Sequence, residues 1–232
     1  MKFCKGGLAL SCAVIMFHGF GGGIFELEPL KDKLNNDYTC FCEAIYGHND
    51  KGKINNNIKY TDWLEYAQKT YHKIKEQYDE ICIVGFSMGA LLALHLAYTY
   101  DLQAIVCINT PIYIWPFMNI LRWIFEDMRK RRIFHIKRFY KAIIAQSIRV
   151  NIQFLFLRKY AKGLIKKITT PIYIAQSKYD DTVKYKSMKY IFDHVLSENK
   201  KCSLYTNSYH DICNTADIEQ LSKDVIEFLN SF

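Results

Sequence analysis

A serine at the centre of a glycine-flanked pentapeptide is the clearest chemical signal in the sequence. Ser87 stands in Gly85-Phe86-Ser87-Met88-Gly89, directly after the apolar run 80–84 and before a helical pattern that begins near Ala90. A serine in a tight turn between a strand and a helix exposes its hydroxyl, and the two glycines let neighbouring backbone segments approach it closely. This arrangement predicts that Ser87 is a nucleophile for acyl transfer.

A glycine-rich loop, His18-Gly19-Phe20-Gly21-Gly22-Gly23, follows the first long apolar run. Such loops can bind phosphate, but this one lacks both the G-x-G-x-x-G spacing and the Lys-Ser/Thr pair of phosphate-binding loops. We therefore expect the backbone N–H groups of Phe20 and Met88 to form an oxyanion hole, which stabilises negative charge on a reacting carbonyl oxygen. His18 is expected to support the loop.

A serine nucleophile needs a base, and the base needs an orienting acid. His210 follows the last predicted strand, and Asp180 and Asp181 follow the strand before it. Open α/β sheets build their sites at these carboxyl ends of strands. His210 is the predicted base. Asp180 is preferred as the acid because Val183 could anchor the following turn in the core, and Asp181 stays an alternative.

The elements that must position these residues alternate between short apolar runs and longer amphipathic ones, which is typical of a mostly parallel sheet covered by helices. Several of the strands are apolar on both faces, as buried parallel strands are. The predicted strands are Ala9–Phe17, Thr39–Ala44, Glu80–Val84, Ala104–Ile108, Pro171–Ala175 and Lys201–Tyr205, and the predicted helices include Thr61–Tyr78, Ala90–Tyr100 and Thr215–Phe232.

The chain of 232 residues is half hydrophobic and 23% charged, which suits a globular domain and excludes a disordered one. Its eight cysteines have no C-x-x-C pair or zinc-type spacing, so we expect reduced thiols in a cytoplasmic protein. The apolar start, 8–17, imitates a short signal peptide but is interpreted as a buried strand. No cofactor or metal is expected.

Positive charge is concentrated in the segment 111–168, which holds 14 of the 31 Lys and Arg residues but only two acidic ones, Glu126 and Asp127. The densest run is Arg129-Lys130-Arg131-Arg132. Because no nucleic-acid-binding module accompanies this charge, we do not expect a nucleic-acid partner. Peripheral contact with anionic lipid is the alternative to a merely solvated surface.

Together these motifs resemble the α/β-hydrolase superfamily, and within it the small bacterial carboxylesterases and monoacylglycerol lipases. The resemblance covers almost the whole chain and rests on the loop at His18, the Ser87 pentapeptide, Gln176-Ser-Lys-Tyr-Asp180 and Ser208-Tyr-His210. It implies the α/β-hydrolase fold, with a core of 1–110 and 168–232 and a helical cap, 111–167, inserted after the sixth main strand. The family's usual glycine before the catalytic histidine is replaced by Tyr209.

The activity implied is hydrolysis of short- to medium-chain acyl esters by Ser87, His210 and Asp180 through an acyl-enzyme intermediate. The substrate partner would be a small acyl ester, with the apolar opening of the cap near its acyl chain. A thioesterase, or a slow-turnover ligand-binding receptor on the same scaffold, stays an alternative. The sequence does not decide the oligomeric state.

Overall fold

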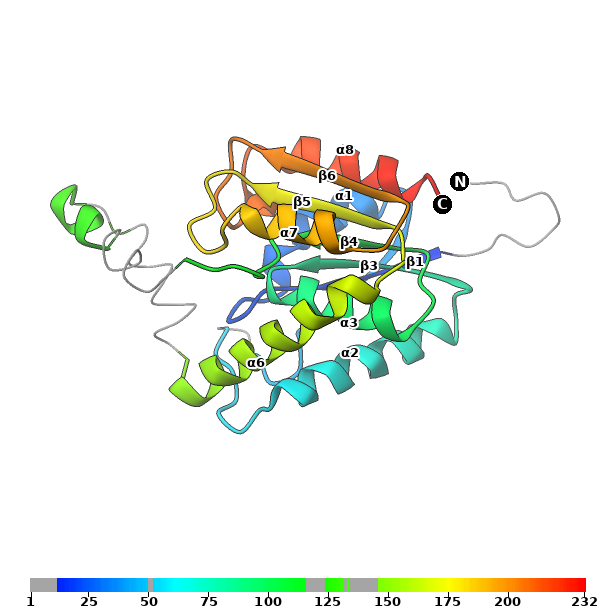
Figure 1. The fold of residues 1–232 in the computed structure, drawn as a ribbon, viewed down its shortest axis with the longest axis horizontal. Helices are drawn as coiled ribbons and strands as arrows, with labels where there is room; N and C mark the ends of the chain where they lie inside the picture. Colours follow the sequence, from blue (N-terminus) through cyan, green and yellow to red (C-terminus); the bar gives the residue numbers. More distant parts are fainter. Residues whose placement is uncertain (1–11, 50–51, 116–123, 132, 134–145) are drawn as a thin grey trace.

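Six parallel strands form one sheet in the order β2-β1-β3-β4-β5-β6 (Figure 1). The computed structural model describes residues 12–49, 52–115, 124–131, 133 and 146–232. All five strand pairs run in parallel, so every carboxyl end reaches the same edge of the sheet. The strands are β1 (Cys12–Phe17), β2 (Thr39–Cys42), β3 (Glu80–Phe86), β4 (Ala104–Ile108), β5 (Ile172–Ser177) and β6 (Lys200–Tyr205).

The central strands are apolar on both faces because helices cover both. Every residue of β4 and β5 is buried, and so are all but the first residues of β1 and β3. β6 lies at the sheet edge and alternates between more and less exposed positions. Two separate apolar clusters, one on each face, therefore hold the sheet between its helices.

Two helical layers flank the sheet (Figure 1). On one face, the buried leucines of α1 and α8 share an apolar cluster with residues of β1, β3, β4 and β5. On the other, α2, α3, α6 and α7 form the second layer. Their bounds are α1 (Glu28–Leu34), α2 (Tyr60–Lys75), α3 (Met88–Thr99), α6 (Ile148–Leu164), α7 (Lys186–His194) and α8 (Ile218–Leu229).

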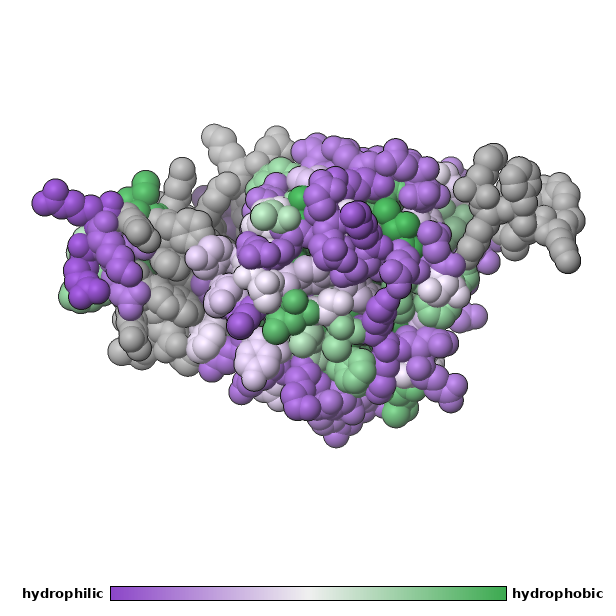
Figure 2. All heavy atoms as spheres, turned by 90° about the horizontal axis from the view of Figure 1, so that it is seen from above, coloured by the Kyte–Doolittle hydropathy of each residue, from purple (hydrophilic) through white to green (hydrophobic). Residues whose placement is uncertain are grey.

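The helix that follows Ser87 is the most enclosed element of the second layer. All residues of α3 from Met88 to Ala97 are buried, because the helix lies between the sheet and the two helices α2 and α6. α8 is different, since it is amphipathic and turns its polar side to solvent. Seen from above, the side on which Figure 1 draws α8, the described surface is largely hydrophilic with small hydrophobic areas (Figure 2).

The predicted architecture is confirmed: a parallel sheet is flanked by helices on both faces. The predicted strands agree with the observed ones to within a few residues, although residues 9–11 of the first lie outside the described part. The predicted helix Thr61–Tyr78 corresponds to α2, which begins one residue earlier, at Tyr60, and ends at Lys75. Lys59 is its N-cap, and the Asp62 carboxylate accepts the Lys59 N–H at 2.8 Å.

The inserted segment contains helical structure in its described parts, at 124–129 and in α6. It follows β4, which is the fourth strand of the described sheet, whereas the family resemblance counts six strands before it. Its boundaries as a cap, 111–167, stay a prediction, and residues 116–123 and 134–145 lie outside the described part. Within the described chain, no helix combines the length and apolar character that crossing a membrane requires.

We expect Gly89→Ala to lower the free energy of unfolding by about 1–3 kcal/mol, as overpacking of a closely packed core does. An added Cβ would overlap the carbonyl oxygen of Phe17 in β1. Gly163→Ala is the matched control, because no atom lies within 4 Å of a Cβ added to this helical glycine. It should raise the free energy of unfolding by up to about 1 kcal/mol, since alanine favours the helix more than glycine does. Urea unfolding measures both, and equal stability of the two variants would contradict this packing.

Candidate active site

Ser87 lies in a strained turn between β3 and α3. Its φ of 52° and ψ of −115° fall outside the helical and strand regions. Its N–H donates to the carbonyl of Ile108 in β4 at 2.8 Å, which fixes the turn to the neighbouring strand. A side chain at Gly85 would overlap the backbone of Gly89 and Ala90, so the turn can be this tight only with glycine there.

A chain of two hydrogen bonds joins the three residues that the sequence singles out. Ser87 Oγ lies 2.9 Å from Nε2 of His210, and His210 Nδ1 lies 2.7 Å from Oδ2 of Asp180. A carboxylate only accepts hydrogen bonds, so the Nδ1 proton is donated to Asp180 and Nε2 is left to accept from the serine hydroxyl. All three residues are buried.

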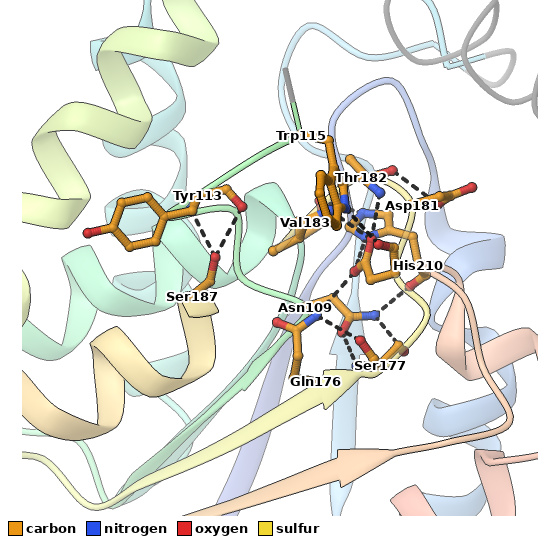
Figure 3. Close-up of polar contacts among 12 residues, drawn as sticks. Asn109, Tyr113, Trp115, Gln176, Ser177, Asp181, Thr182, Val183, Ser187 and His210 are labelled. Carbon is orange, nitrogen blue, oxygen red and sulfur yellow. Dashed lines mark hydrogen bonds and ion pairs between the residues drawn. The ribbon is translucent and has the colours of Figure 1, made fainter. Parts of the chain in front are cut away.

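The Asp180 carboxylate is held by the loop that follows β5. Oδ1 accepts the backbone N–H groups of Thr182 and Val183, each at 2.8 Å, and Oδ2 also accepts the Gln176 amide at 3.3 Å. Asp181, the alternative acid, points elsewhere: its Oδ1 accepts the Thr182 hydroxyl at 3.4 Å (Figure 3). The geometry therefore joins Asp180, and not Asp181, to His210.

Asn109, which the sequence analysis did not single out, links the loops of the acid and the base. Its side-chain NH₂ donates to the His210 carbonyl at 2.6 Å and to the Ser177 hydroxyl at 3.1 Å, and its Oδ1 accepts the Ser177 N–H at 2.7 Å (Figure 3). The residue follows β4 with φ of 47°. Asparagine tolerates this left-handed conformation better than most residues do. An asparagine directly after a predicted strand, in Asn109-Thr-Pro, was the one feature of the sequence that could have pointed to this residue.

The glycine-rich loop is held by two histidines and a glutamate. Nε2 of His18 accepts the Ile45 N–H at 2.9 Å, and Nε2 of His48 accepts the Gly21 N–H at 3.4 Å. The Glu26 carboxylate accepts the Gly19 N–H at 2.8 Å and fills the space where a side chain of Gly22 would be. His18 thus supports the loop as expected, while the roles of His48 and Glu26 were missed.

The two N–H groups expected to form the oxyanion hole lie at the start of α3 and in this loop. Met88 is the first residue of α3, so its N–H has no carbonyl one turn earlier in the helix to bond. Phe20 lies inside the turn that the Gly22 N–H closes on the Gly19 carbonyl at 3.2 Å. The two N–H groups thus belong to backbone that is held in place, by the buried helix α3 for Met88 and by the hydrogen-bonded turn for Phe20.

The inserted segment touches this site at two points. The indole N–H of Trp115 donates to the backbone carbonyl of Asp180 at 2.9 Å. On the other side, the ring of Phe154 in α6 packs against Phe20, with their centroids 4.7 Å apart. The segment therefore contacts both the loop of the acid and the glycine-rich loop. Among the described residues, no cluster of His, Cys, Asp and Glu could hold a metal ion.

The two histidines behind the glycine-rich loop make stability depend on pH. Burial lowers the pKa of His18 from 6.5 to about 4, and burial together with the neighbouring His18 lowers that of His48 to about 4. Between these values the unfolded chain binds protons that the folded protein does not. The free energy of unfolding should therefore fall as pH falls from 6.5 to about 4.

Urea unfolding at a series of pH values across this window measures the effect. The variant His48→Gln removes one of the two groups, so its free energy of unfolding should fall less steeply with decreasing pH. The same slope in both proteins would contradict a lowered pKa of His48 in the folded state.

Comparisons with known proteins agree with this fold. The sequence model of the alpha/beta hydrolase family matches residues 14–187. The chain is 24% identical over 225 residues to a carboxylesterase of Bacillus subtilis (strain 168), covering 94% of this chain and 92% of the relative. It is 24% identical over 227 residues to a thermostable monoacylglycerol lipase of Bacillus sp. (strain H-257), covering 93% and 89%.

A similar solved structure is the monoacylglycerol lipase of Paleococcus ferrophilus, with a TM-score of 0.73 and 16% identity over 94% of this chain and 93% of that one. At this identity the likeness concerns the fold. The family model, by contrast, spans most of the chain, including the Ser87 turn and Asp180. This protein therefore belongs to the alpha/beta hydrolase family.

Proposed function

We propose that the protein is a serine carboxylic ester hydrolase that works through Ser87, His210 and Asp180. The observation that carries the proposal is the pair of hydrogen bonds, 2.9 and 2.7 Å long, that runs from the serine hydroxyl through the imidazole to the carboxylate. The two curated relatives, a carboxylesterase and a monoacylglycerol lipase, support the ester class.

In the proposed mechanism, Nε2 of His210 takes the proton from Ser87 as the oxygen attacks the ester carbonyl. The imidazolium that forms is stabilised by the Asp180 carboxylate, which also fixes the tautomer. The N–H groups of Phe20 and Met88 bind the oxyanion. The alcohol leaves with the proton from His210, and water then attacks the acyl-enzyme by the same route.

We propose short- to medium-chain acyl groups as substrates. The serine is only 6% exposed, and the aromatic side chains of Phe20 in the glycine-rich loop and Phe154 in α6 pack against each other where the inserted segment meets that loop. Apolar side chains at this position favour apolar acyl chains over polar ones. Because each buried CH₂ contributes about 0.8 kcal/mol, the preference for chain length should be graded.

The expected compartment and lipid contact stay proposals. The seven cysteines of the described chain are free thiols, which supports a reducing cytoplasmic setting.

In the described part of the basic segment, Phe125 and Met128 are exposed beside Arg129, Lys130 and Arg131, which supports contact with anionic lipid. Co-sedimentation with anionic but not neutral vesicles checks this contact.

The test of the proposed function is hydrolysis of p-nitrophenyl esters of increasing chain length, with a monoacylglycerol alongside, by wild type and Ser87→Ala. We expect kcat to fall on the order of a million-fold in the variant, because the nucleophile is lost. Activity of Ser87→Ala near that of wild type would overturn the assignment. A folded wild type inert on every ester, but active on a thioester or binding without turnover, would favour the alternatives.

The pair Asp180→Asn and Asp181→Asn identifies the acid with matched chemistry. Replacing the acid with an amide favours the wrong imidazole tautomer and lowers kcat about 10⁴-fold in the known Ser-His-Asp triad. We expect a loss of this order for Asp180→Asn and only a few-fold change for Asp181→Asn, measured on the same ester. The reverse order would make Asp181 the acid.

A further inference from the structure

A groove of about 700 Å³ lies between α6 and the segment that leaves β4. Its volume is within the range of pockets that bind small molecules, about 300–1,000 Å³. Neither Ser87 nor His210 lines it. The lining residues are Ile112, Tyr113, Ile114, Trp115, Leu155, Phe156, Arg158, Lys159, Lys162, Lys184 and Lys186.

The polar part of this lining carries only positive charge. Three cations come from α6: Arg158, Lys159 and Lys162. Two more are Lys184, in the loop before α7, and Lys186, the first residue of α7. No carboxylate of the described residues forms an ion pair with any of the five. The guanidinium of Arg158 is partly buried, and this loss of solvent lowers its pKa. The described lining residues therefore carry no negative charge to balance these cations.

Aromatic rings hold several of these cations over the groove. The ammonium groups of Lys162 and Lys186 lie 4.3 and 4.2 Å from the ring centroid of Tyr113, and that of Lys184 lies 4.9 Å from Trp115. Cation–π contacts of this kind keep a charge desolvated on one side while leaving its other N–H groups to bind an anion. The rings thus fix the positions of these ammonium groups.

The remaining lining is apolar and partly exposed. Leu155 and Phe156 on α6 are 42% and 50% exposed, and Ile112 and Ile114 line the opposite wall. A ligand that fits both parts combines a negative group with an apolar chain. A phosphate group suits five cations on two walls better than a carboxylate does, because it carries up to two charges and three accepting oxygens.

We propose that this groove binds an organic phosphate with a single apolar chain. Its walls meet the loop of the proposed acid. Ile114 forms an antiparallel bridge with Val183, the Lys184 N–H donates to the Tyr113 carbonyl at 2.8 Å, and the Trp115 indole reaches the carbonyl of Asp180. The proposed ligand site adjoins the loop of Asp180, but neither Ser87 nor His210 lines it. The proposal therefore stands independently of the proposed hydrolase activity.

Isothermal titration of the Ser87→Ala protein with dodecyl phosphate, below its critical micelle concentration, tests the proposal without interference from hydrolysis. We expect it to bind at least about tenfold more tightly than inorganic phosphate, dodecyl maltoside or dodecanoate. Equal binding of inorganic phosphate would exclude a role for the apolar wall. Equal binding of dodecyl maltoside would exclude anion recognition, and equal binding of dodecanoate would exclude a preference for phosphate.

Replacing lysines of the groove by glutamine tests whether the ligand binds at this groove. Lys159→Gln/Lys186→Gln changes two exposed lining residues and should weaken dodecyl phosphate binding about tenfold or more. The matched control Lys166→Gln/Lys223→Gln removes the same charge from exposed residues outside the lining and should leave binding unchanged. Thermal unfolding checks that both variants fold, and Arg158→Gln is a second lining variant. Equal weakening by the control pair, or none by the lining variants, would overturn the proposal.

Discussion

The backbone conformation of Ser87 is the constraint on which the rest of the site depends. Holding a residue at φ of 52° with ψ of −115° costs on the order of 1–3 kcal/mol, and such a cost persists only where the surroundings fix the backbone. Here β3 and β4 fix it from one side through the Ser87–Ile108 hydrogen bond, and the buried helix α3 fixes it from the other. Packing of the core thus stabilises a strained turn at its edge.

The same edge gathers the other groups because all the strands are parallel. Ser87 follows β3, Asn109 follows β4, Asp180 follows β5 and His210 follows β6, in the order of the strands across the sheet. A parallel sheet brings the residues after successive strands into one row. Residues separated by as many as 123 positions thereby come within hydrogen-bond distance.

The strands could be predicted from the sequence because their signal is local: runs of Val, Ile, Cys and Phe that end at polar or glycine residues. β4 was predicted at its exact bounds, 104–108. The short helices α1 and α7 were not predicted. Glu28–Leu34 has only two buried residues, and Lys186–His194 has two as well, so neither offers the long apolar periodicity that identifies a helix.

The chain order of Ser87, Asp180 and His210 was readable because each follows a strand in a recognisable motif. Asn109, Glu26 and His48 were not, since each acts through partners that only the folded chain brings near. Asn109 bonds residues 68 and 101 positions away, and no local pattern reports such distances. The choice of Asp180 over Asp181 also depends on the backbone, because the N–H groups of Thr182 and Val183 turn its carboxylate inward.

The hydrogen bonds of Asn109 also fix the point at which the inserted segment leaves the sheet. Asn109 directly follows β4, and its side chain is bonded to Ser177 at the carboxyl end of β5 and to the His210 carbonyl. The segment therefore starts from a point that is tied to the loops of both the acid and the base. A molecule held by the first residues of the segment is thereby kept at a set distance from the reacting groups.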